Sequence, residues 1–530
     1  MRLIPSEGRN TANYWCTWRN QRLFTPNAFL HMRTFDKVAA DRMQRDILCD
    51  EFLFGKWGLL PDYMQEVRKD MYVLLDDGWD IPYNGSYSTF GSLVLNEEKF
   101  PYGGKTPAEN LAILNKKVLD LGYAGTALWV PMSCVGETKD NLFDHDAFRE
   151  YWIERAKWLH EAEIAYIKVD WGFHKQDPEY RKILTEVCRE YAPGMQVEHA
   201  SVDGFFRVPD RNPRLEYEKY KDFLKVSDAY RCYDVRFDFN SVTTLARAAA
   251  MLTLDCDMEG DCKGYINVGE EPIIAAALGC TMGVMSHPLL RGSILSLVPD
   301  DFKNGISHRI TMKSEFHSFD HYVRALRWQR LAPALSFKKG ETVASEKWLE
   351  DSWTYEKTPY AYSENEIVGK TLFQTSPQIV ARGVALPEIV SIYKPYPRSN
   401  SKQYEPFIAA SKNRETGVYT IATLPRTIDG VMNCTIPAVD VVARGLSADK
   451  CFGVFGEYKS LTLEFDECIE GKRLFGGDIL LDDQPDITDE EGVHIEGNKL
   501  ILDGALLSRI GLEGAAYRDL ADPGSVFLLV

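Results

Sequence analysis

The sequence predicts an α/β protein, with a parallel (β/α)8 barrel of the TIM type over residues 1–337 and an all-β sandwich domain over residues 338–530. Two observations indicate the barrel. Short apolar runs alternate with helical patterns, which is typical of a parallel sheet. Charged side chains also stand where the apolar runs end, and in a barrel such residues line one mouth. Beyond about residue 338 the helical periodicity gives way to period-two alternation, which indicates strands.

The expected strands of the barrel are short apolar runs with β-branched and aromatic residues. They cover residues 13–18, 71–75, 126–130, 165–170, 196–199, 226–234 and 281–285, and a further polar segment, 255–258, follows a helix. An open doubly wound sheet is the alternative fold. That fold uses a Gly-rich phosphate turn after its first strand, and none is present in this sequence.

The expected helices carry start signals. Thr106-Pro107-Ala108-Glu109 matches a capping box with proline in the first turn, Asp144 precedes an apolar stripe, and Asp177-Pro178 repeats the pattern. The helices are expected over residues 35–57, 61–70, 107–121, 144–159, 178–192, 241–252, 273–278 and 314–331.

The C-terminal part is predicted to be an antiparallel β-sandwich. Leu461, Leu463 and Phe465 alternate with polar residues, and Gly497-Asn498 between two apolar runs is typical of a hairpin turn. The chain has no low-complexity linker before this part, so we expect the two domains to pack rigidly.

Composition excludes several classes of function. The net charge of −17 disfavours nucleic acid as a partner, because phosphate contacts need Lys and Arg. The sequence has no run of eighteen apolar residues and no apolar signal core near Met1, so we expect no membrane partner and a cytoplasmic location, or secretion if a leader was removed. The 11 cysteines form no CxxC pair, which favours free thiols, and no motif indicates a metal or a cofactor.

The run from Ala165 to Gly172 contains the most informative residues. Lys168 lies inside an apolar strand and Asp170 lies at its end. A charge in a buried strand must be paired or face a polar cavity. The run Met71–Leu75 likewise ends in carboxylates, Asp76 and Asp77. Together these residues favour a catalytic barrel mouth over a structural ion pair.

Five motifs in order resemble the α-galactosidase and α-N-acetylgalactosaminidase superfamily of retaining glycosidases (the melibiase-like family 27 type), over roughly residues 13–335. They are Asp76-Asp77-Gly78-Trp79, Phe100-Pro101 with Gly103, Lys168-Val169-Asp170, Tyr230-Arg231 with Asp234-Val235, and Asp255-Cys256-Asp257-Met258.

The resemblance implies roles for individual residues. Asp170 is the expected nucleophile and Asp234 the acid/base. The expected substrate-binding residues are Asp76, Asp77, Lys168, Arg231, Trp18, Trp129, Glu198, His199 and Asp257. Asp76 and Asp77 would accept hydrogen bonds from the sugar's 4- and 6-hydroxyls, and Trp18 and Trp129 would form walls.

The chain departs from the family pattern at four places. Trp171 stands where the family has Asn, and Gly78 where it often has Cys. The spacing of Arg231 and Asp234 is one residue shorter than usual, so Asp228 remains an alternative acid/base. Glu198, His199 and Asp203 compete as readers of the sugar's substituent.

The resemblance implies a retaining exo-α-glycosidase, most simply an α-galactosidase, whose substrate is an oligosaccharide or glycoconjugate. An α-N-acetylgalactosaminidase or a β-L-arabinopyranosidase would use the same mechanism. A barrel that binds glycans without turnover is the alternative from another class. The sequence indicates no oligomeric state.

Overall fold

The computed structural model describes residues 1–9, 12–24, 43–81, 91–200, 222–231, 262–267, 271–285, 318–337, 378–382, 407–424, 426–427, 434–435, 438–516, 518 and 521–530. The strands of its first sheet are β1 (Tyr14–Cys16), β2 (Tyr72–Leu75), β3 (Thr126–Val130), β4 (Tyr166–Val169), β5 (Gln196–Ala200), β6 (Ala229–Arg231), β7 (Cys262–Asn267) and β8 (Thr281–Val284).

These strands form a closed parallel barrel. Each strand from β1 to β7 pairs in parallel with the next, and β8 pairs in parallel with β1. The predicted (β/α)8 barrel is therefore confirmed. The short strand β9 (Ser336–Phe337) adds to β7 in the antiparallel direction. Strand β7 begins at Cys262, and the polar segment 255–258, which was expected at this point of the barrel, lies outside the described residues.

Alternation along the strands separates an inner from an outer layer. The barrel interior holds one cluster of buried side chains, which includes Tyr14, Cys16, Tyr72, Leu74, Ala127, Trp129, Tyr166 and Ala229. The intervening residues, such as Trp15, Val73 and Ile167, belong to the larger core outside the barrel. Successive strand residues point to opposite faces, so each strand contributes to both layers.

The helices α5 (Pro107–Asp120), α6 (His145–Glu161) and α7 (Pro178–Tyr191) begin where their caps predict. The side chains of Thr106, Asp144 and Asp177 each accept a hydrogen bond from a backbone N–H of the first turn, at 3.1, 2.9 and 2.9 Å. Other helices are α1 (Trp18–Phe24), α4 (Asp50–Phe54), the 3-10 helix η1 (Gln65–Asp70), α10 (Glu271–Leu278), α14 (Ser318–Trp328) and α15 (Gly504–Gly511).

Two expected helices differ from the structure. The described part of the segment 35–57 is not one continuous helix, because Cys49 has extended backbone angles and α4 begins only after it. The segment 61–70 becomes the 3-10 helix η1, which starts after Met64 in a left-handed conformation (φ 43°).

The described residues of the C-terminal part form β-sheets and the helix α15. Its strands are β10 (Gln378–Arg382), β11 (Phe407–Lys412), β12 (Tyr419–Leu424), β13 (Arg426–Thr427), β14 (Cys434–Thr435), β15 (Asp440–Leu446), β16 (Phe452–Phe455), β17 (Ser460–Phe465), β18 (Leu474–Asp478), β19 (Val493–Glu496), β20 (Lys499–Asp503) and β21 (Gly524–Leu529). Two five-stranded sheets have the orders β10-β15-β17-β20-β19 and β11-β12-β16-β21-β18.

The two sheets form the expected sandwich, but its strands are not all antiparallel. The ring centroids of Phe452 in one sheet and Phe465 in the other are 6.3 Å apart. The prediction of a purely antiparallel sandwich is wrong, because β12 pairs with β16 and β15 pairs with β17 in parallel. The chain leaves β15, forms β16 in the opposite sheet and returns as β17, and such a crossover brings strands back in the same direction. The predicted hairpin of β19 and β20 around Gly497 is confirmed.

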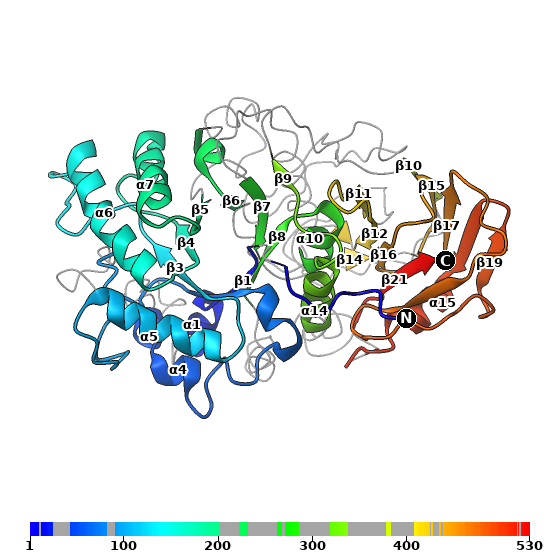
Figure 1. Cartoon of the computed structure of the whole chain (residues 1–530), viewed down its shortest axis with the longest axis horizontal. Helices are drawn as coiled ribbons and strands as arrows, with labels where there is room; N and C mark the ends of the chain where they lie inside the picture. The colour runs from blue at the N-terminus through cyan, green and yellow to red at the C-terminus, as the bar shows by residue number, and fades with distance from the viewer. Residues whose placement is uncertain are drawn as a thin grey trace, which may run out of the picture.

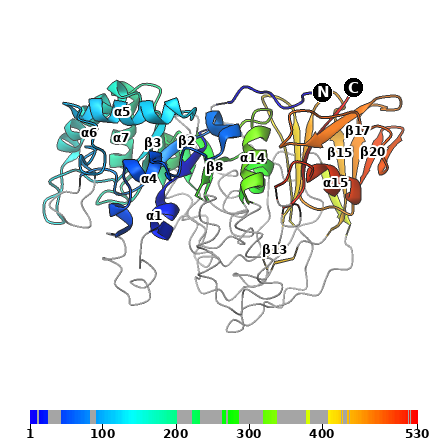
Figure 2. The ribbon, with the colours of Figure 1, turned by 90° about the horizontal axis from the view of Figure 1, so that it is seen from below.

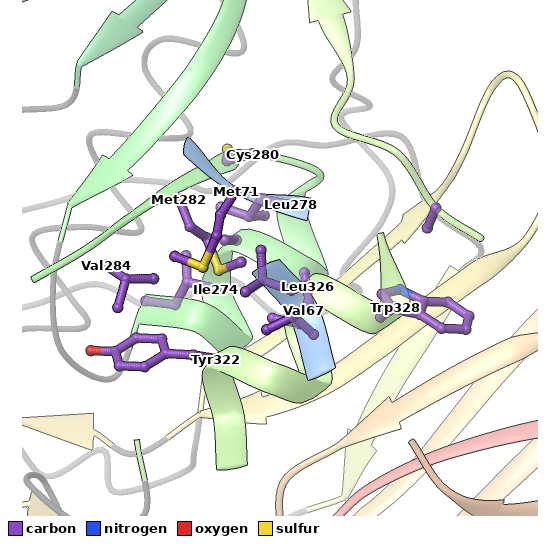
Figure 3. Close-up of a cluster of buried hydrophobic side chains, with 14 of the residues drawn as sticks. Val67, Met71, Ile274, Leu278, Cys280, Met282, Val284, Tyr322, Leu326 and Trp328 are labelled. Carbon is purple, nitrogen blue, oxygen red and sulfur yellow. The ribbon is translucent and has the colours of Figure 1, made fainter. Parts of the chain in front are cut away.

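Helix α14 lies between the barrel and the C-terminal sheets (Figures 1 and 2). Its residues Tyr322 and Leu326 belong to a buried cluster with Val67, Met71, Ile274 and Met282 (Figure 3). On its other side, the Trp328 indole N–H donates to the Thr420 hydroxyl of β12 at 2.8 Å. The boundary expected between residues 337 and 338 stays a prediction, since residues 338–377 are not described.

Across the described ranges, no helix has both the length and the apolar character needed to cross a membrane.

Candidate active site

Three carboxylates stand at the C-terminal ends of two barrel strands that β3 separates. Asp76 and Asp77 follow β2 directly, and Asp170 follows β4. Asp76 and Asp77 are buried, whereas the side chain of Asp170 is 17% exposed. Side chains at this end of a barrel line its mouth. Asp170 is therefore the carboxylate of the three that a ligand in the mouth can reach with the least rearrangement.

Asp170 is surrounded by donors that do not bind it tightly. The Trp129 indole N–H donates to its Oδ2 at 3.1 Å. Lys168 Nζ and Arg231 Nη1 each lie 3.8 Å from the same oxygen, which is close enough for attraction but longer than a hydrogen bond. The carboxylate thus has one hydrogen bond from the barrel interior and two cations beside it.

Lys168 connects Asp170 to Asp76. Its ammonium group donates to Oδ2 of Asp76 at 2.7 Å, and both side chains are almost fully buried. Burial alone would raise the pKa of Asp76, but Lys168 outweighs it and lowers that pKa below its usual range. Burial and Arg231 lower the pKa of Lys168, whereas Asp76, Cys16 and Asp170 raise it, and the net shift is upward. Both partners are therefore charged.

The Cys16 thiol donates to the same oxygen of Asp76, with Sγ 3.2 Å away. Burial and the charge of Asp76 raise the pKa of this thiol far above its usual range, so it stays protonated and remains a donor.

Asp77 has a different partner, Arg45, which sequence reasoning missed. The two side chains form a buried ion pair. Burial raises the pKa of Asp77 to about 7, against the opposing charge of Arg45, and the neighbours Asp76 and Asp80 add to the increase. Gly78 permits this approach, because a Cβ there would lie 2.7 Å from the Cα of Arg45. The glycine also has a φ of 109°, which side chains rarely adopt.

Aromatic rings flank the mouth. The rings of Trp129 and Trp171 are 5.5 Å apart and tilted by 52°. Trp18 and Trp171 are half-buried and pack against the interior cluster. Trp171 was noted in the sequence only as a departure from the family pattern, and its position next to Asp170 is the signal that could have identified it.

His199 is not at the mouth, so the expected substrate contact does not fit. It is fully buried on the outer face of β5, where its ring contacts the Arg181 guanidinium at 3.0 Å and the Thr185 hydroxyl at 2.7 Å, both on α7. Burial and the charge of Arg181 hold the pKa of His199 well below its usual range. The neutral ring of His199 therefore links β5 to α7 through Arg181 and Thr185.

Glu198 points the other way, into the barrel, but it does not reach a ligand either. It is 0% exposed. Its two oxygens accept hydrogen bonds from the hydroxyls of Tyr14 at 3.3 Å and Tyr166 at 2.7 Å. The expectation that Glu198 contacts the sugar directly therefore does not fit its buried position between two tyrosines.

Asp228, the alternative acid/base, precedes β6 and so lies at the opposite end of the barrel. Its carboxylate accepts from the backbone N–H of Val197 at 2.9 Å and from Arg189 at 3.3 Å. This placement disfavours a catalytic role. Asp234, Asp203 and Asp257 lie outside the described residues.

Within the described part of the chain, no group of three or more His, Cys, Asp or Glu side chains is arranged to hold a metal ion. The cysteines whose thiols are described, such as Cys16 and Cys134, are unpaired with one another.

No family model and no curated protein matches this chain. Several solved structures are similar to it. A β-L-arabinopyranosidase of glycoside hydrolase family 27 from Geobacillus stearothermophilus is 8% identical, covers 99% of this chain and 96% of its own, and has a TM-score of 0.39. A candidate α-N-acetylgalactosaminidase from Bacillus halodurans is 9% identical over 100% and 99% of the two chains, with a TM-score of 0.39.

A candidate α-galactosidase or melibiase from Bacteroides fragilis is 11% identical, with a TM-score of 0.32, over 62% of each chain. At these identities and scores the similarity assigns no activity to this chain.

Proposed function

We propose that this protein is a retaining exo-α-glycosidase that hydrolyses terminal sugars of galacto configuration. The observation that carries the proposal is the placement of Asp170, a partly exposed carboxylate at the end of β4 with two cations 3.8 Å away and one indole hydrogen bond. In the proposed reaction Asp170 attacks the anomeric carbon, and water then hydrolyses the glycosyl-enzyme.

The cations have a defined part in this mechanism. A carboxylate nucleophile carries a negative charge, and Lys168 and Arg231 each place a cationic nitrogen 3.8 Å from Oδ2 of Asp170. Because neither cation is within hydrogen-bond distance of Asp170, the nucleophile is not locked in an ion pair. The acid/base that protonates the leaving oxygen is proposed from the resemblance to be Asp234.

The preference for a galacto-configured sugar is supported by Asp76. Its carboxylate accepts hydrogen bonds and the adjacent Lys168 donates them, so together they suit a hydroxyl that enters the mouth beside Asp170. An axial 4-hydroxyl would reach this pair, and an equatorial one would point elsewhere. The sugars α-galactose, α-N-acetylgalactosamine and β-L-arabinopyranose share this arrangement.

The test is the substitution Asp170→Asn, assayed on p-nitrophenyl glycosides of these sugars and of α-glucose. The change is nearly isosteric but removes the nucleophile, so turnover should fall by roughly 10³-fold or more at an unchanged melting temperature. A 2-deoxy-2-fluoroglycosyl fluoride should add one sugar mass to the wild-type protein and none to the variant.

Asp228→Asn is the matched control, because it makes the same change at the opposite end of the barrel and should keep turnover. Activity of Asp170→Asn within tenfold of wild type would exclude the nucleophile assignment. Glycan binding by wild type without any turnover would favour the non-catalytic alternative.

A further inference from the structure

The loop after β3 (residues 131–143) and the loop after β4 (residues 170–177) are joined to each other at the mouth of the barrel. The second loop begins with Asp170 and Trp171. The backbone N–H of Met132 in the first loop donates to the carbonyl oxygen of Trp171 at 2.9 Å. The backbone pairing of the two strands thus continues into the loops, directly beside the proposed nucleophile.

The contact between the loops extends to His174. The backbone N–H of Phe173 donates to the hydroxyl of Ser133 at 2.7 Å, and that of His174 donates to the carbonyl oxygen of Met132 at 2.9 Å. Gly172 permits this close approach, because a Cβ there would lie 2.4 Å from the carbonyl carbon and oxygen of Met132. The two loops are therefore in direct contact on both sides of this glycine.

A buried glutamate of the first loop holds the far end of the contact. The side chains of Glu137 and His174 are almost fully buried, and Oε1 of Glu137 lies 2.5 Å from Nε2 of His174. The same oxygen accepts from the backbone N–H of Phe143 at 2.9 Å, and Oε2 accepts from that of Cys134 at 2.6 Å. One carboxyl group thus closes the first loop upon itself and binds the second loop.

The ring of His174 is also held on its face. Tyr180, in the first turn of α7, stacks on it with the ring centroids 3.8 Å apart and the planes 13° from parallel. The hydroxyl of Tyr180 donates to the carbonyl oxygen of Phe143 at 2.7 Å. His174 therefore has two separable contacts, one through its ring nitrogen with Glu137 and one through its ring face with Tyr180.

We propose that Glu137 and His174 are positioning residues, whose contact fixes the second loop to the first and so holds Asp170 and Trp171 in place at the mouth. A displacement of about 1 Å in a reacting group can cost roughly 10²-fold in rate. The inference rests on the proposed function, because it assigns the pair a role toward the proposed nucleophile.

The substitution His174→Phe tests the pair, because it keeps an aromatic ring for the stack with Tyr180 and removes the contact with Glu137. On the p-nitrophenyl glycoside that wild type hydrolyses best, kcat should fall by roughly 10- to 100-fold while KM changes little. His174→Gln is the conservative variant. Its side-chain amide can take the place of Nε2, so it should recover most of the lost kcat.

A second measurement needs no turnover. The indole rings of Trp129 and Trp171 are 5.5 Å apart and tilted by 52°, so their absorption bands should couple and give a circular dichroism signal. The difference between wild type and Trp171→Phe isolates this signal. It should be weakened in His174→Phe and restored in His174→Gln, because only the first variant releases the loop that carries Trp171.

Asn115→Ala is the matched control. It also removes a buried polar contact, but at the start of β3, at the opposite end of the barrel. It should lower the melting temperature and leave kcat and the Trp129–Trp171 signal unchanged. If His174→Phe does not fold, Glu137→Gln takes its place, since it keeps the size of the side chain and leaves one oxygen for three donors.

The outcomes separate the two proposals. A wild-type protein that hydrolyses none of the glycosides would overturn the proposed function, and a dichroism signal weakened in His174→Phe would still support the hold of the pair on Trp171. An unchanged signal, an unchanged kcat, or an equal loss of kcat in Asn115→Ala would each overturn the positioning role.

Discussion

Asp76 and Asp77 are adjacent in sequence but have different partners. Asp76 faces into the barrel and binds Lys168, whereas Asp77 forms its ion pair with Arg45. The sequence suggested two equivalent carboxylates that each accept a sugar hydroxyl. In the structure only Asp76 is connected, through Lys168, to Asp170.

We therefore expect Asp76→Ala to remove the preference for α-galactosides over α-glucosides. A site built around such a hydrogen bond discriminates by up to ~10⁴-fold, and the ratio of the two kcat/KM values should fall toward one. Asp77→Asn, which can still accept a hydrogen bond from Arg45, should keep most of the discrimination. The assignment would be reversed if Asp77→Asn lost the preference and Asp76→Ala kept it.

Asp80 should make stability depend on pH. Its Oδ2 accepts from the backbone N–H of Gly91 at 2.8 Å and of Leu93 at 3.1 Å, and burial raises its pKa to about 6 from an ordinary value of 3.8. The folded state binds this proton more tightly than the unfolded state does. The contribution of Asp80 to the free energy of unfolding is therefore greatest below pH 3.8 and decreases as the pH rises from about 4 to 6.

The substitution Asp80→Asn replaces the titrating carboxyl group with an amide that does not titrate. The free energy of unfolding of the variant minus that of wild type should increase between pH 4 and 6, by at most about 3 kcal/mol. Urea denaturation at several pH values measures the difference. A difference that is constant across this range would show that Asp80 titrates normally in the folded protein.

Residues at strand ends were predictable, and their partners were not. Lys168, Asp170 and Asp76 stand out because charge interrupts an apolar run. Arg45 has no such signal, since it comes 32 residues before Asp77 in the expected helix 35–57, where a charged side chain is ordinary. Strict alternation along β5 predicts that adjacent Glu198 and His199 face opposite sides, which excludes a shared site.

At the scale of elements, Asn115 fixes helix α5 to two neighbours. Its side-chain oxygen accepts from the backbone N–H of Thr126 at the start of β3 at 2.9 Å. Its side-chain amide donates to the carbonyl oxygens of Ala162 at 3.2 Å and Glu163 at 2.9 Å, just after α6. The buried amide of Asn115 thus supplies hydrogen-bond partners to backbone groups where α5, the end of α6 and the start of β3 meet.

We expect Asn115→Ala to lower the free energy of unfolding by about 2–4 kcal/mol, because it leaves buried backbone groups without partners. Chemical denaturation measures this change. The adjacent Lys116→Ala is the control: its exposed ion pair with Asp120 should be worth less than about 1 kcal/mol. Equal effects of the two substitutions would contradict the role of Asn115.

Element starts were easier to predict than element ends or pairings. The caps at Thr106, Asp144 and Asp177 act on backbone groups two or three residues away, so local sequence suffices. The start of β7 at Cys262 and the parallel pairing of β15 with β17 depend on strands distant in the chain, and no local pattern encodes them.

At the scale of the whole molecule, two arginines in and just after helix α14 join the two parts. Arg324 of α14 forms two hydrogen bonds, at 2.9 and 2.8 Å, with Asp478 of β18, and both side chains are at most 1% exposed. Two residues after the end of α14, Arg330 makes a similar paired contact with Asp70 of η1. The two parts should therefore unfold together.

Asp478→Ala should lower the free energy of unfolding by about 3–5 kcal/mol, because it leaves the Arg324 guanidinium buried without its partner. Scanning calorimetry should show one transition at a lower temperature. Asp482→Ala is the matched control, since Asp482 pairs with Arg327 but is 64% exposed. This substitution should lower the free energy of unfolding only slightly. Two separate transitions in wild type would contradict a shared interface.

Asn13 has a consequence for the timing of folding in the cell. Its side chain accepts from the backbone N–H of Met282 on β8, 269 residues later, and donates to Gln329 at 2.7 Å. At about 5–20 residues per second, a ribosome needs roughly 13 to 54 s to make that interval. Throughout this time the nascent β1 has an unpaired edge. The barrel can close only after β8 (Thr281–Val284) has been made, which is just past the middle of the 530-residue chain, so the edge of β1 must avoid wrong pairing until then.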